Sequence, residues 1–152
     1  MSISPATFSS GLSDETTVYA KFRHDLLHSA NEVVIESPFI TTERAKTLYP
    51  IFEKLVNRGV RVYVVTRDPR EQSETMEYQS EVGIQHFEAL GVQVLLCTGN
   101  HHRKLAILDR QVLWEGSLNI LSQAKSREIM RRIDSEKVAT EMFNFLKFGN
   151  FL

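Results

Sequence analysis

Short apolar runs alternate with longer segments of helical spacing through the first two thirds of this 152-residue sequence. The runs are VVI (33–35), VRVYVVT (60–66) and VQVLLCT (92–98). Apolar side chains recur every three or four residues over about 14–30, 42–58 and 80–90. Buried parallel strands joined by helices produce this order. The sequence therefore predicts an α/β fold, with a mixed, partly parallel sheet flanked by helices on both faces.

The second half predicts antiparallel strands and a closing helix. The expected strands are KLAILD (104–109), VLWEG (112–116) and REIMRRI (127–133), followed by a helix over 135–148. Arg110–Gln111 is the expected two-residue turn. Residues 67–81 are polar and predict a long loop, and Pro50 predicts a kink or break in the second helix. We expect residues 1–12 to form a flexible lead-in and residues 13–152 to form a single domain.

Composition excludes several classes of protein. The single cysteine, Cys97, rules out an intramolecular disulfide, and its apolar surroundings predict a buried thiol. Neither a secretory signal nor an apolar stretch of about 20 residues is present, so we expect a cytoplasmic protein with no membrane partner. His24 and His28 have the spacing of a zinc pair but lack a third ligand, so we expect no metal and no cofactor. Phosphate-loop and dinucleotide-binding motifs are also missing, which argues against ATPases and dinucleotide enzymes.

Six residues between 102 and 119 form the pattern HxK(x)4D(x)6GSxN. They are His102, Lys104, Asp109, Gly116, Ser117 and Asn119. Side chains two residues apart on a strand point to the same side, so His102 and Lys104 can converge on one anion. A neutral imidazole is a capable nucleophile near pH 7, and fixed donors stabilise the charge on phosphoryl oxygens. Asp109 points away from Lys104 by strand parity, which predicts a structural role at the strand end.

This pattern resembles the phospholipase D superfamily of phosphodiesterases. The order of helices and strands, together with Glu128 in SREIM, extends the resemblance over about residues 14–148. The resemblance implies that His102 forms a covalent phosphohistidine without a metal, and that Glu128 orients the other ring nitrogen of His102. Lys104 and Asn119 would bind the phosphoryl oxygens. Gly116, Ser117 and Asp109 would have supporting roles, with the Ser117 hydroxyl as a further phosphate donor.

The chain carries one copy of the motif, whereas cleavage of a phosphodiester also needs a group that protonates the leaving oxygen. Short members of the superfamily with one motif form twofold dimers in which each subunit contributes its motif. The resemblance therefore predicts a homodimer that shares one active site, with the second copy of His102 as the general acid.

The resemblance favours nucleic acid as the substrate, because short members are mostly nucleases. Residues 34–69 are also similar to the phospholipase D-like module at the C-terminal end of some bacterial helicase-type proteins. The net charge is −1, but residues 103–132 carry an excess of four positive charges. The candidate nucleic-acid-binding residues are Lys125, Arg127, Arg131, Arg132 and Arg67. Three alternatives stay open: an ordinary solvated face, a lipid phosphodiesterase, and a non-catalytic nucleic-acid-binding or dimerisation module of a helicase-like protein.

Overall fold

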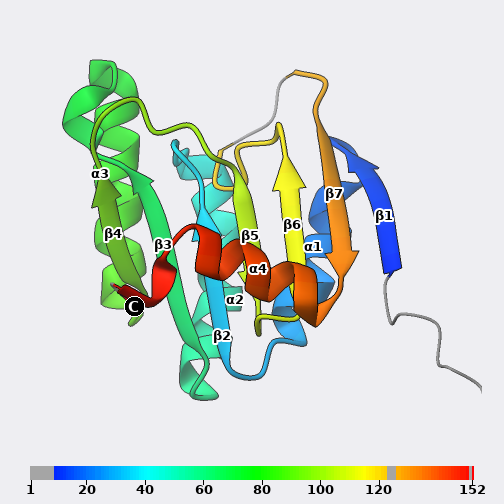
Figure 1. The fold of residues 1–152 in the computed structure, drawn as a ribbon. Helices are drawn as coiled ribbons and strands as arrows, with labels where there is room; N and C mark the ends of the chain where they lie inside the picture. The colour runs from blue at the N-terminus through cyan, green and yellow to red at the C-terminus, as the bar shows by residue number, and fades with distance from the viewer. Residues whose placement is uncertain (1–8, 123–125, 151) are drawn as a thin grey trace, which may run out of the picture.

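The computed structural model describes residues 9–122, 126–150 and 152. The strands are β1 (Ser9–Asp14), β2 (Glu32–Glu36), β3 (Arg61–Arg67), β4 (Gln93–Cys97), β5 (Leu105–Leu108), β6 (Val112–Gly116) and β7 (Ile129–Asp134). The α-helices are α1 (Val18–Leu27), α2 (Thr42–Asn57), α3 (Glu74–Ala89) and α4 (Glu136–Phe145), and short 3-10 helices span Pro69–Glu71 and Phe148–Asn150. The strands form one sheet in the order β1-β7-β6-β5-β2-β3-β4 (Figure 1).

The sheet is mixed. β2, β3 and β4 are parallel to one another, whereas β5 pairs antiparallel with both β2 and β6, and β7 pairs antiparallel with β6 and β1. Helices α1, α2 and α3 cover one face, and α4 lies across the other (Figure 1). The larger core, under the three helices, contains Phe22, Phe52 and Trp114, and the smaller core contains Phe143 and Phe148. The predicted α/β class and the placement of helices on both faces are confirmed.

The prediction of a flexible lead-in over residues 1–12 is wrong for residues 9–12, which belong to β1, while residues 1–8 lie outside the described residues. The sequence SSGLSD has little apolar character, so no apolar pattern marks it as a strand. β1 is held at the sheet edge by backbone pairing with β7. The first helix also starts later than expected, at Val18. The Asp14 carboxylate accepts hydrogen bonds from the N–H groups of Thr16 and Thr17, at 2.9 and 3.1 Å, and these bonds form a turn before the helix.

Two helix predictions need correction. The third helix begins at Glu74 instead of Ser80, so much of the expected loop is helical. Glu74 and Glu77 lie in its first turn, where negative side chains interact favourably with the helix dipole. Pro50 does not split the second helix, because α2 continues from Thr42 to Asn57 with Pro50 inside it.

Two local predictions also differ from the structure. Cys97 is only half-buried, because β4 is an edge strand of the sheet. The β5–β6 turn is centred on Asp109 and Arg110, one residue earlier than expected. Both have positive φ, 55° and 51°, and the Gln111 N–H donates to the Leu108 carbonyl at 2.9 Å. Positive φ at both central residues is the requirement of a type I′ turn, which suits the twist of a hairpin.

Candidate active site

His102 and Lys104 lie at the end of the loop that joins β4 to β5. The His102 side chain is exposed, and its ring centroid lies 6.2 Å from that of Phe39. The Lys104 ammonium donates a hydrogen bond to the His102 carbonyl at 2.6 Å. The loop therefore presents an accessible imidazole next to a positive charge, at the upper edge of the sheet in Figure 1.

Strand pairing brings the second half of the motif to the same edge. Leu105 at the start of β5 is in register with Glu115 on β6, and the Gly116 N–H donates to the Lys104 carbonyl at 3.4 Å. Gly116 is in turn in register with Met130 on β7. Residues that precede β5, follow β6 and precede β7 therefore lie together, although up to 26 positions separate His102 from Glu128 in the sequence.

Gly116 and Ser117 fit tightly against β7. A Cβ atom on Gly116 would lie 2.2 Å from the Ile129 carbonyl oxygen, so no larger residue fits without a shift of the backbone. The Ser117 N–H donates to the Ile129 carbonyl at 3.0 Å, and the Ile129 N–H donates to the Ser117 hydroxyl oxygen at 3.0 Å. This close approach accounts for the Gly-Ser pair and fixes the segment that leads to Asn119.

Asn119 and Glu128 complete the group. The Asn119 Oδ1 atom is buried and has no hydrogen-bond partner among the residues described, so this oxygen can still accept a hydrogen bond. Hydrogen bonds from the hydroxyls of Ser117 and Ser126, and the positive charge of Lys104, hold the pKa of the Glu128 carboxyl below its usual value. In the described part of the chain no hydrogen bond joins Glu128 to His102, so the expected orientation of the ring stays a prediction.

Asp109 lies at the opposite end of β5. Its carboxylate accepts hydrogen bonds from the N–H groups of Ala30, Asn31 and Glu32, at 2.9, 2.8 and 2.9 Å. These three bonds fix the start of β2 to the β5–β6 turn. The contacts agree with the structural role expected from strand parity, and they place Asp109 apart from the other five motif residues.

A family model described as "Cardiolipin synthase, PLD-like domain" matches residues 23–147. The chain belongs to this phospholipase D-like family. A search of curated proteins found no matching sequence.

Solved structures of phospholipase D-like proteins have the same fold. Nuc, a phospholipase D family member from Salmonella typhimurium, aligns over 92% of both chains with a TM-score of 0.74 and 17% identity. NucT from Helicobacter pylori aligns with a TM-score of 0.68 and 14% identity, over 92% of this chain and 94% of that one. Phosphatidylserine synthase from Haemophilus influenzae Rd KW20 has a TM-score of 0.65 and 16% identity, over 91% of this chain and 38% of its own. At these identities the likeness shows the fold alone.

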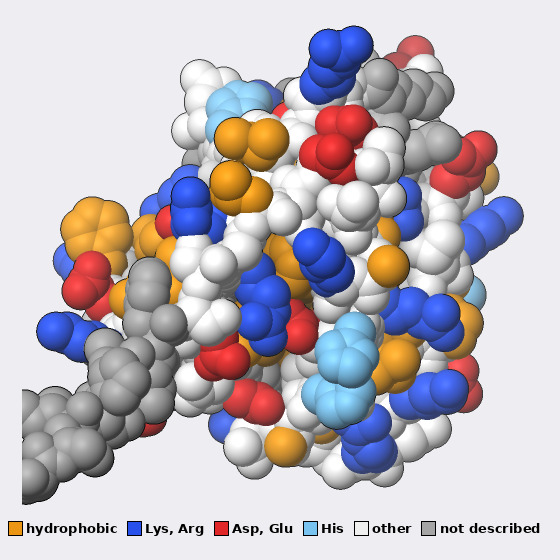
Figure 2. Space-filling view, turned by 90° about the vertical axis from the view of Figure 1, so that its right-hand side faces the viewer, with side chains coloured by type: hydrophobic (Ala, Val, Ile, Leu, Met, Phe, Trp, Pro, Cys, Tyr) orange, Lys and Arg blue, Asp and Glu red, His pale blue; other side chains and the backbone are white. Residues whose placement is uncertain are grey.

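The candidate nucleic-acid-binding residues of this phospholipase D-like chain do not lie on one surface. Arg131 and Arg132 are on opposite faces of β7: Arg131 lines a groove beside α4, whereas Arg132 is paired with Asp25 of α1 at 2.6 Å. Arg127 is exposed, and Lys125 lies outside the described residues. The view onto the β1 edge shows basic and acidic side chains interspersed, without a continuous basic stripe (Figure 2).

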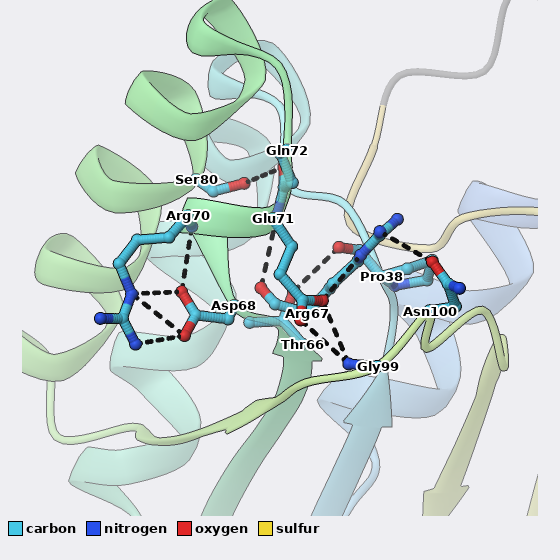
Figure 3. Close-up of polar contacts among 10 residues, drawn as sticks. All are labelled: Pro38, Thr66, Arg67, Asp68, Arg70, Glu71, Gln72, Ser80, Gly99 and Asn100. Atoms are coloured by element: carbon cyan, nitrogen blue, oxygen red, sulfur yellow. Dashed lines mark hydrogen bonds and ion pairs between the residues drawn. The ribbon is translucent and has the colours of Figure 1, made fainter.

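Arg67 lies at the end of β3, away from the other basic candidates. Its guanidinium pairs with Glu71 at 3.2 Å and donates to Asn100 Oδ1 at 3.3 Å (Figure 3). Glu71 also accepts a hydrogen bond from the Gly99 N–H at 3.0 Å. Arg67 and Glu71 therefore hold the beginning of the loop that carries His102, a role that the sequence analysis did not identify.

Sequence analysis also missed Glu36, a buried carboxylate at the end of β2. Arg103 pairs with it at 2.8 Å, and His101 contacts the same oxygen, so the two neighbours of His102 both reach Glu36. The available signal was a charged residue directly after the apolar run VVI. The rings of His24 and His28 are tilted by 35° with their centroids 4.1 Å apart, and the described residues contain no cluster of three or more His, Cys, Asp or Glu that could hold a metal.

Proposed function

We propose that this chain is a metal-independent phosphodiesterase, specifically a nuclease that acts through a covalent phosphohistidine in a homodimer. The observation that carries the proposal is the convergence of Lys104, Ser117 and Glu128 beside the exposed His102, at one end of β5, β6 and β7. Convergence of a nucleophile with phosphate-binding donors is the arrangement that phosphoryl transfer needs.

The proposed reaction has two steps. The His102 imidazole attacks phosphorus and forms a P–N bond while the P–O bond to the leaving oxygen breaks, and His102 of the partner subunit protonates that oxygen. Water then attacks phosphorus and gives its proton to the partner's imidazole, the P–N bond breaks, and both imidazoles return to their starting states. Lys104 and Asn119 stabilise the charge on the phosphoryl oxygens in both steps.

An apolar groove beside the site supports the homodimer. The groove, of about 570 Å³, lies next to α4 and includes Lys104 and Gly116 in its lining. Three large apolar side chains that line it are exposed: Leu12, Ile129 and Phe145 are 59, 64 and 79% accessible. Exposed apolar patches of this kind commonly mark protein interfaces. A second copy placed here would bring its own motif close to Lys104.

Nucleic acid is the proposed substrate, and the sequence resemblance to short nuclease members is its main support. Lys104 provides positive charge for a polyanion beside the exposed His102. This chain aligns with Nuc and NucT over more than nine tenths of their own length, so they are of similar size. In the described part of the chain no helix has the length and apolar character to cross a membrane.

The test compares plasmid DNA, single-stranded DNA, RNA and phosphatidylcholine vesicles as substrates, with and without EDTA. We expect cleavage of nucleic acid that persists in EDTA and falls by at least roughly 1,000-fold in His102→Ala and Lys104→Ala. Acid quenching during turnover should trap an acid-labile phosphate on the wild-type protein but not on His102→Ala. Loss of activity on chelation, or cleavage of lipid alone, would contradict the proposal. Binding of nucleic acid without cleavage would favour the non-catalytic module.

A further inference from the structure

Glu36 is a fully buried carboxylate next to the site, with 0% of its surface accessible. It ends β2, an interior strand of the sheet, where its backbone is in register with Leu105 of β5 on one side and Val65 of β3 on the other. The backbone that carries the carboxylate is therefore fixed by strand pairing on both sides. Burial of a charge is unfavourable unless the charge is paired, so the Glu36 carboxylate needs partners among its neighbours.

The compensation comes from the two residues that flank His102. Arg103 Nε donates to Glu36 Oε1 at 2.8 Å, and His101 Nε2 contacts the same oxygen. Since residues 101 and 103 both turn toward Glu36, the backbone of residue 102 is held between two contacts to one rigid atom. The His102 side chain remains exposed, outside these contacts.

Glu32, at the other end of β2, shows what a purely structural carboxylate looks like in this fold. It is 3% accessible, and both of its oxygens are bonded: Oε1 to Arg110 at 3.3 Å and Oε2 to Arg61 at 3.4 Å. Glu36, by contrast, leaves Oε2 buried without a hydrogen-bond partner among the residues described. An unsatisfied buried oxygen is costly, and such costs concentrate at functional sites.

We propose that Glu36 is a positioning residue that fixes the His102 backbone through His101 and Arg103, so that the imidazole is held in line with phosphorus. Arg67 and Glu71 hold the start of the same loop, at Asn100 and Gly99, and Glu36 holds its end. The catalytic consequence rests on the proposed function. The structural consequence, an ordered His102, does not.

The experiment compares Glu36→Gln with Glu32→Gln in the full chain. Each substitution neutralises a buried carboxylate of β2 that contacts two side chains from other segments, so both should lower the melting temperature. We expect only Glu36→Gln to lower kcat, on the order of tenfold or more, with KM changed by less than about threefold. We also expect only Glu36→Gln to shift or broaden the NMR signal of the His102 ring, assigned with His102→Ala.

Two outcomes separate failure of this inference from failure of the proposed function. If the wild-type protein cleaves no phosphodiester, the proposed function fails, while the His102 signal still tests the positioning role. If Glu36→Gln matches Glu32→Gln in both kcat and the His102 signal, Glu36 is only structural and the inference is overturned. Should Glu36→Gln fail to fold, Arg103→Gln is the second variant. It removes one of the two contacts to Glu36 by changing the half-exposed Arg103 side chain, and it must shift or broaden the NMR signal of the His102 ring.

Discussion

The carboxylates of Asp109 and Glu128 have different surroundings, and these indicate different roles. Asp109 accepts three backbone N–H groups from the start of β2, so its charge is used to join two segments of the chain. Glu128 is bonded to hydroxyl groups and lies within the field of Lys104, where its charge faces the site. The environment of Glu128 favours the ionised carboxylate, and it includes Lys104, a group expected to bind phosphate.

Replacing Ser117 by alanine tests this difference through pH. The Ser117 hydroxyl is the largest cause of the lowered pKa of Glu128, so Ser117→Ala should raise that pKa toward its usual value. Because the pKa is lowered in the folded state, the associated stability is present above the unfolded pKa and is lost as pH falls through the folded pKa. Ser117→Ala should therefore raise the pH at which the protein unfolds in acid.

Carbon-13 NMR of the Glu128 carboxyl measures the pKa directly. Ser126→Ala serves as the comparison, and it should move the Glu128 pKa less, since Ser126 ranks after Ser117 among the causes. An ordinary glutamate titration at this position in the wild-type protein would contradict the interpretation.

At the scale of helices and strands, the local sequence pattern predicted the buried strands. The exposed edge strand depends on pairing with a distant segment, so the local pattern did not predict it. β2, β3 and β5 are buried along most of their length, so each leaves a continuous apolar run that sequence can reveal. β1 was missed because its sequence, SSGLSD, contains a single buried residue and its partner β7 lies more than 100 positions away.

The same limit applies to the site. The spacing of the motif predicted His102, Lys104 and Asn119 as a group, because six fixed residues carry strong local information. Glu36 could not be predicted as part of it, since its partners come from a loop 65 or more positions later in the sequence. The contacts of Arg67 with Glu71 and Asn100 depend likewise on how β3 and the β4–β5 loop meet.

Gly116→Ala tests the fit between β6 and β7. The added Cβ would lie 2.2 Å from the Ile129 carbonyl oxygen, so the two strands must move apart. We expect the free energy of unfolding to fall by about 1–3 kcal/mol. Activity should also fall in the protein that still folds, because Ser117 and Asn119 follow the displaced residue. Denaturant unfolding and cleavage kinetics measure the two effects.

Gly11→Ala is the matched control on the edge strand β1. A Cβ atom there meets nothing within 4 Å, so stability should stay within roughly 0.5 kcal/mol of wild type. Equal losses of stability in Gly116→Ala and Gly11→Ala would mean that the close approach to the Ile129 carbonyl is not the reason for a glycine at position 116.

The whole molecule has two differently covered faces. Three helices bury one face of the sheet, whereas α4 lies across the other (Figure 1). A groove lined by residues of β1, β7 and α4 stays open on that second face. The exposed Leu12, Ile129 and Phe145 come from β1, β7 and α4, so they become one patch only after the sheet has formed. This asymmetry leaves an apolar surface next to Lys104 and Gly116, where the proposed homodimer would form.

Phe145→Asp tests whether that surface forms the dimer. A charge at the most exposed of the three apolar positions should prevent association without unfolding the monomer, because Phe145 is 79% accessible. Sedimentation velocity should then show monomers, and cleavage should fall by roughly 100-fold or more, since the partner's general acid is lost. Tyr78→Asp, at a 69% accessible position on α3, should leave the dimer and its activity unchanged. A monomeric Phe145→Asp protein that cleaves at the wild-type rate would show that one His102 is enough, and the shared site would have to be abandoned.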